Sequence, residues 1–108
     1  SLGGAIVYET LKQTNTDNPL VDHAITLGGA FIANKTDVER ALLQTRWINA
    51  YNKDDQALQI VFRAASLDAS PPAGTIPLAI SLQIVEGRNK LLDIDMSPHI
   101  LQNVSTHM

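Results

Sequence analysis

Apolar and polar residues alternate most regularly shortly after Gly74. Large aliphatic side chains occupy every second position from Leu78 to Ile84, and smaller or polar residues stand between most of them. A period of two is typical of a strand that buries one face. Turn-forming residues follow at 86–89, and the alternation then resumes from Leu92 to Met96. This pattern predicts a β-hairpin.

A third strand is expected upstream, within residues 57–67, followed by a proline-rich connector at 68–74. The Ala and Leu residues of the 57–67 segment also leave a helix open as an alternative, because short apolar runs fit either period. The first third of the chain is rich in β-prone residues around 6–10 and again at 24–32. We expect a short strand in each of these two segments.

One long helix is predicted from Thr36 to Tyr51. The Thr36 hydroxyl can cap the first free amides, and Glu39 stands three residues later, as in a capping box. The polar residues 52–55 would end this helix. Together these elements predict a single α+β domain, residues 1–108, with an antiparallel sheet of about four to five strands and the helix packed on one face.

The predicted helix would have two apolar sides, and only one of them can cover the sheet. The second side could be buried beneath the N-terminal third or the C-terminal tail. It could instead be a contact surface, because aromatic residues dominate protein interfaces and exposed apolar patches are uncommon. Self-association is the simplest form of such contact. The candidate interface residues are Leu43, Trp47, Ala50 and Tyr51.

Composition limits the classes of partner and of chemistry. A net charge of -3 disfavours nucleic acid and anionic membranes, and no apolar run is long enough to cross a bilayer. The absence of cysteine excludes thiol chemistry and weakly favours an intracellular reducing compartment. The start at Ser1, without an initiator Met, predicts a fragment or a processed product. No cofactor is expected, and the predicted partner is a protein.

Two groups of polar residues could carry chemistry. Asp22 and His23 are adjacent, and a carboxylate beside an imidazole suits acid–base catalysis, although a solvated loop pair is the favoured interpretation. Asp93 and Asp95 share one face of a predicted strand, with His99 just beyond. They could bind a metal or divide into an acid and a base, but a strand edge kept soluble by charge is favoured over both.

Glycine occurs in pairs at residues 3–4 and 28–29, within two similar hexapeptides that start 25 residues apart. Neither pair has the spacing of a phosphate-binding loop. We therefore expect both pairs to serve turns or bulges.

A further pattern consists of residues 36–38, Trp47, Tyr51, residues 60–62 and residues 74–78. It resembles the globular domain of rhabdovirus matrix proteins. The resemblance implies a helix followed by strands, self-association beneath an envelope and contact with a nucleocapsid. The leading functional hypothesis, drawn from the second apolar side of the helix, is a non-catalytic interaction or self-assembly domain of a structural protein, for example a viral matrix-like one. The alternative is a small α+β ligand-binding domain or enzyme, with its pocket between helix and sheet.

Overall fold

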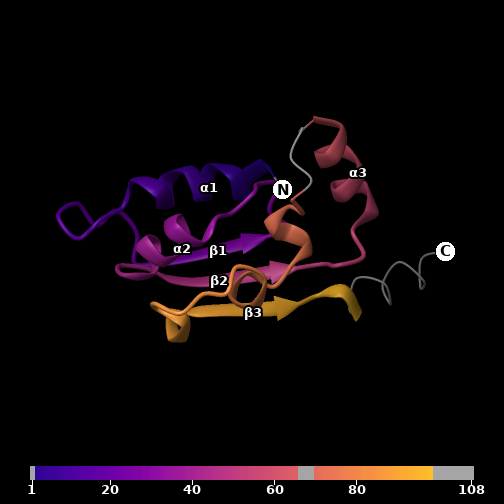
Figure 1. Cartoon of the computed structure of the whole chain (residues 1–108). Helices are drawn as coiled ribbons and strands as arrows, with labels where there is room; N and C mark the ends of the chain where they lie inside the picture. Colours follow the sequence, from indigo (N-terminus) through magenta and orange to yellow (C-terminus); the bar gives the residue numbers. More distant parts are fainter. Residues whose placement is uncertain (1, 66–69, 99–108) are drawn as a thin grey trace.

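The computed structural model describes residues 2–65 and 70–98 and is built on a three-stranded parallel sheet (Figure 1). The strands are β1 (His23–Leu27), β2 (Arg46–Tyr51) and β3 (Leu91–Asp95), in that spatial order. Strand β2 is central and pairs Ile48 with both Ile25 and Leu92. All three strands therefore end at the same edge of the sheet.

One helix precedes β1, and further helical segments connect the strands. They are α1 (Leu2–Gln13), α2 (Lys35–Leu42), α3 (Gln56–Ala65) and the single turn α4 (Leu78–Ser81), with short 3₁₀ turns η1 (Ala73–Thr75) and η2 (Arg88–Lys90). Helix α1 begins at the edge where the strands end and runs back across the sheet (Figure 1). Connections between parallel strands are almost always right-handed, so two successive connections in the order β1, β2, β3 fall on the same face.

The hydrophobic core lies between this face of the sheet and the helices. Trp47 is fully buried beneath two aromatic rings, with its centroid 6.3 Å from that of Tyr8 and 6.5 Å from that of Phe31. Tyr8 and Phe31 stack at 4.6 Å. The other buried members of the core come from α1, β1, α2, η1, α4, the loop after α4 and β3: Leu11, Ala24, Val38, Ala41, Leu42, Ala73, Leu78, Ala79, Ile84 and Leu91.

A row of polar side chains crosses the same face of the sheet. Thr26 donates its hydroxyl to Asn49 Oδ1 at 3.0 Å, and Asn49 Nδ2 donates to Asp93 Oδ1 at 3.0 Å. The Asp93 carboxylate also accepts the N–H groups of Leu78 and Ala79, at 2.8 and 2.9 Å. Buried polar groups need such partners. The row therefore joins all three strands and fixes the start of α4 against β3.

The expected antiparallel sheet of four to five strands with one long helix is wrong. The segment predicted as a helix from Thr36 to Tyr51 divides into helix α2 and strand β2, separated by a turn at 43–45. The helix is capped by Asn34, whose Oδ1 accepts the Asp37 N–H at 2.9 Å, and not by Thr36. Residues 46–51 become a strand because β2 pairs on both sides, a long-range gain that outweighs local helix propensity.

The predicted hairpin is also wrong, since only its second half, at β3, is a strand. Residues 78–81 form α4, after Pro77 and under the cap that Asp93 provides. Residues 57–67 were expected to be a strand, but α3 covers 56–65, so the helical alternative is confirmed there. The predicted strand around 6–10 lies inside α1, whereas β1 overlaps the one expected at 24–32.

The two glycine pairs have different settings. Gly3 and Gly4 lie within α1, so the expected turn at this pair is wrong. Gly28 has a φ of 54° and lies in a bend directly after β1. This agrees with the expectation that the pair at 28–29 serves a turn or bulge.

Candidate functional site

The edge where the three strands end is the first place to look for a site. In open sheets with parallel strands, ligands bind outside the carboxyl ends of the strands, where the following loops converge. Three segments meet at this edge (Figure 1): residues 28–29 after β1, residues 52–55 after β2 and residues 96–97 after β3. The start of α1 lies at the same edge.

Glycines allow the backbones at this edge to touch. A Cβ on Gly4, near the start of α1, would lie 2.8 Å from the Gly29 Cα. A Cβ on Gly74 would lie 2.3 Å from the Gly28 carbonyl carbon and 2.4 Å from the Gly29 nitrogen. The Gly74 N–H donates to the Gly29 carbonyl, and the Asn52 N–H donates to the Gly74 carbonyl, both at 2.8 Å. The start of α1, the ends of β1 and β2, and η1 are thus held together.

Asp55 is a carboxylate that is held in place at this edge and faces a cavity. The Leu58 N–H donates to Asp55 Oδ1 at 2.9 Å, which fixes the side chain at the start of α3. Asp55 is half-buried and lines a cavity of about 330 Å³, together with Gly28 and Met96 among others. Its Oδ2 has no hydrogen-bond partner among residues 2–65 and 70–98. The neighbouring Asp54 is exposed and does not line this cavity.

The end of β3 is hydrogen-bonded to the loop that contains Asp55. The Met96 N–H donates to the Tyr51 carbonyl at 2.8 Å, and the Lys53 N–H donates to the buried Ser97 hydroxyl at 3.0 Å. Lys53 is two residues before Asp55. His99 is two residues after Ser97 in the sequence and lies outside the described residues.

The acidic residues and the histidine singled out from the sequence do not converge. Asp22 and His23 are exposed at the amino end of β1, opposite the edge where the strands end. Asp93 is engaged in the core by Asn49 and the start of α4. Asp95 Oδ1 accepts the N–H of Ser97. Among residues 2–65 and 70–98, no group of three or more His, Asp or Glu side chains is placed to hold a metal ion.

The four candidate interface residues have unequal exposure. Trp47 and Ala50 are buried, Tyr51 is half-buried, and Leu43 is 54% exposed. The helical side that was expected to group them is absent, because three of them belong to β2 and Leu43 to the preceding turn. An interface formed by these residues stays a prediction.

Sequence reasoning missed Asp55, which had appeared only as part of a helix stop. It also missed Ser1-Leu2-Gly3, because the segment that follows was expected to be a strand and is α1. A Ser-x-Gly at the start of a helix, followed later in the chain by Asp and then His, is the signal that was available.

Comparisons of the chain with family models, with curated proteins and with solved structures gave no match. The resemblance to rhabdovirus matrix proteins therefore has no support from them, and the long helix over 36–51 and the strands at 60–62 and 74–78 on which it drew are not formed. Within the described part of the chain, none of the helices has both the length and the apolar character that a membrane crossing requires.

Proposed function

We propose that this protein is a serine hydrolase of the α/β type that cleaves carboxylic esters. In this proposal Ser1 is the nucleophile, His99 the general base and Asp55 the carboxylate that orients the histidine. The observation that carries the proposal is the link between the Asp55 loop and the end of β3, made by the Lys53 N–H and the Ser97 hydroxyl at 3.0 Å. This hydrogen bond joins the loop that contains Asp55 to the segment that precedes His99 in the sequence.

The order of residues along the chain supports the same assignment. Ser1-Leu2-Gly3 matches the second half of the G-x-S-x-G elbow, in which a serine stands between a strand and the helix packed against the sheet. Helix α1 begins at Leu2 and is packed on this sheet in the core. In α/β hydrolases the serine is followed by the acid and then by the histidine, which is the order of Ser1, Asp55 and His99.

The proposed reaction proceeds through an acyl-enzyme. Ser1 Oγ attacks the ester carbonyl carbon while His99 accepts its proton, and His99 then donates that proton to the leaving alcohol. Water, deprotonated by His99, attacks the acyl carbon and releases the carboxylic acid and Ser1. The Leu2 N–H is one of the first amides of α1, which have no partner within the helix, so it suits the negative oxygen of the tetrahedral intermediate.

Asp55 is preferred to Asp54 because of its surroundings. The Asp55 side chain is half-buried, is held by the Leu58 N–H and faces a cavity, whereas Asp54 is exposed to solvent. A carboxylate that orients a histidine must itself be held in place, because the geometry of the pair sets the tautomer and stabilises the imidazolium. Asp54 therefore supplies a matched control, one residue away and of identical chemistry.

The test uses the natural polypeptide that contains these residues. We expect a fluorophosphonate to label the protein and Ser1→Ala to abolish both labelling and hydrolysis of p-nitrophenyl butyrate. Asp55→Asn should lower kcat by roughly 10³-fold to 10⁴-fold, as the loss of the acid does in other triads, while Asp54→Asn leaves kcat within about twofold. Undiminished labelling of the Ser1→Ala variant, or equal losses in the two Asp variants, would refute the proposal.

The self-assembly role expected from the sequence remains a second proposal. No contact of the described residues specifically favours it, because two of its four candidate residues are buried.

A further inference from the structure

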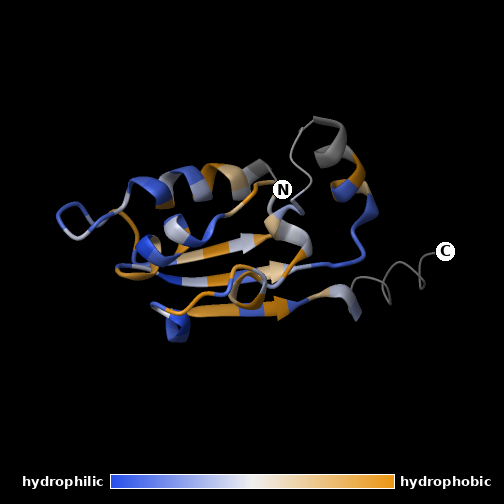
Figure 2. Ribbon diagram, in the orientation of Figure 1, coloured by the Kyte–Doolittle hydropathy of each residue, from blue (hydrophilic) through white to orange (hydrophobic). Residues whose placement is uncertain are grey.

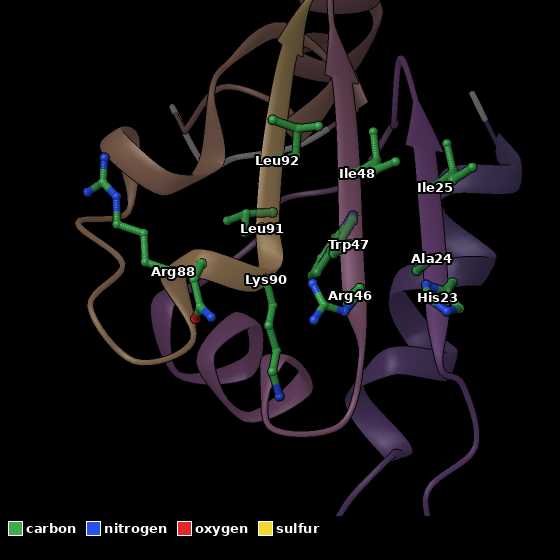
Figure 3. Close-up of a pocket in the computed structure, with 11 residues that line it drawn as sticks. His23, Ala24, Ile25, Arg46, Trp47, Ile48, Arg88, Lys90, Leu91 and Leu92 are labelled. Carbon is green, nitrogen blue, oxygen red and sulfur yellow. The ribbon is translucent and has the colours of Figure 1, made fainter.

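The second face of the sheet is apolar and uncovered. The core and the helices that form it lie on the first face, whereas Ile25 and Leu92 on the second face are 57% and 55% exposed. Figure 3 shows Ile25, Ile48 and Leu92 side by side on the three strands, and the register pairs them. The hydrophobic colour on the strands in Figure 2 marks the same apolar character. A second row lies two residues further along: Leu27, Ala50 and Ile94.

Basic side chains line one end of this face. A cavity of about 690 Å³ lies over the amino ends of the strands and is lined by Ile25 and Leu92 together with His23, Arg46, Arg88 and Lys90. Neither arginine takes part in an ion pair within residues 2–65 and 70–98. The face therefore combines an aliphatic surface with an unneutralised basic end.

We infer that this face is the seat of an amphipathic α-helix from the same polypeptide, with acidic residues placed over Arg46 and its neighbours. All-parallel sheets occur almost only with both faces covered, because helices connect their strands and pack on them. The strands themselves are typical of strands that are covered on both sides, because each places at least one apolar side chain on each face. Unpaired arginines call for carboxylates at one end of that cover.

The dimensions fit one helix. Three strands spaced about 4.8 Å apart span about 10 Å, and a helix with its side chains is about 10–12 Å wide. A five-residue strand is about 16 Å long, which about 11 helical residues would cover. A helix of three turns lying along β2 would therefore bury both apolar rows.

The same dimensions disfavour a second copy of this chain as the cover. A face of about 10 by 16 Å offers on the order of 200 Å², whereas a stable interface between proteins buries about 800 Å² on each partner. A helix within the same polypeptide needs no such area, because its connection removes most of the entropic cost of association. The inference rests on the sheet face alone and is independent of the proposed hydrolase.

The experiment measures how accessible the face is in the natural polypeptide. Residues 1–108 contain no cysteine, so Leu92→Cys places a thiol on this face, and Val85→Cys provides an exposed control, since Val85 is 70% exposed before η2. Reaction with a maleimide is timed for each folded variant and for the same variant in urea. We expect the folded Leu92→Cys protein to react at least about tenfold more slowly than the folded control, at every protein concentration. Equal rates, or protection that disappears on dilution as for a second copy, would overturn the inference.

A charge reversal tests the basic end. Arg46→Glu should speed the reaction of the Leu92→Cys thiol several-fold, roughly the effect of losing about 1 kcal/mol from a charge pair, while Lys35→Glu on the exposed part of α2 should not. If Arg46→Glu fails to fold, a photoreactive p-benzoylphenylalanine at position 92 decides the question. Cross-links to an apolar helical segment of the same polypeptide support the inference, and cross-links to another molecule refute it.

Discussion

Asn49 joins all three strands and the start of α4, so its replacement by leucine is the most informative perturbation of this fold. Leucine keeps the branched outline of asparagine, but its two methyl groups are bulkier than the amide oxygen and nitrogen, so it would crowd this fully buried site. The variant would lose four hydrogen bonds. One comes from Thr26 at 3.0 Å, one goes to Asp93 at 3.0 Å, and two go to the carbonyls of Ile76 and Ala73, at 3.1 and 3.5 Å. No cavity is created, and the expected destabilisation combines the lost polar contacts with crowding at a buried position.

The expected change in the free energy of unfolding depends on the polar groups that lose Asn49 as a hydrogen-bond partner. Each buried polar group that loses its partner costs about 1–3 kcal/mol, and more when the group is charged. The Thr26 hydroxyl still accepts the Trp47 Nε1–H, and Asp93 still accepts two N–H groups from α4, so neither group is left entirely unpaired. We therefore expect Asn49→Leu to lower the free energy of unfolding by about 3–5 kcal/mol, a large part of the ~5–15 kcal/mol of a typical domain.

Urea unfolding followed by fluorescence is the assay, because Trp47 is the only tryptophan and its Nε1 donates to Thr26 at 3.0 Å, beside the substituted residue. Asn89→Leu, at an exposed position in η2, is the matched control and should change the free energy of unfolding by less than about 0.5 kcal/mol. A loss below about 1 kcal/mol for Asn49→Leu, with the m-value unchanged, would show that the polar row does not hold the sheet together.

Two further predictions concern the glycine contacts and the titration of a core tyrosine. Gly74→Ala should destabilise the protein by roughly 1–3 kcal/mol, because the new Cβ would lie 2.3 Å from the Gly28 backbone. Gly3→Ala is the control: its Cβ would meet nothing within 4 Å, so the variant should be neutral or slightly stabilised. Urea unfolding measures both. Burial raises the pKa of Tyr8 to about 12, above the ordinary value of about 10, so the stability that the neutral hydroxyl contributes is fully present below pH ~10 and is lost as the pH rises through 12. Tyr8→Phe should flatten the fall in the urea midpoint between pH 10 and 12; an equally steep fall in that variant would contradict this origin.

Some of the candidate site was visible in the sequence and some was not. The roles proposed for Ser1 and His99 rest on their order along the chain and on the Ser-x-Gly motif, which need only the sequence. The choice of Asp55 over Asp54 could not be made from two adjacent aspartates of the same chemistry. It depends on the Leu58 N–H and on the cavity that Asp55 faces, and both arise only when α3 starts where it does.

Local patterns misassigned the segment 78–85 for a definite physical reason. Alternation of apolar residues favours a strand, but a strand also needs a neighbour with which to exchange hydrogen bonds. The Leu78 and Ala79 N–H groups instead donate to Asp93, 15 and 14 residues away, and this cap forms the turn of α4. Residues 46–51 show the opposite error, since they were predicted as helix and form strand β2. Their two strand partners, around Ile25 and Leu92, are distant in the sequence.

The sequence by itself determined the features that depend on neighbouring residues: a helix within 36–42, the β-prone segments that became β1 and β3, and the turn at Gly28. The tertiary structure alone decided that the strands are parallel, that β2 is their centre, and that Asp55 and the end of β3 share an edge. Helix caps and turns are stabilised by hydrogen bonds a few residues apart, so their signals are local. Strand pairing gains its free energy from partners 20 to 45 residues away, and no local pattern of apolar residues records which partner will be chosen.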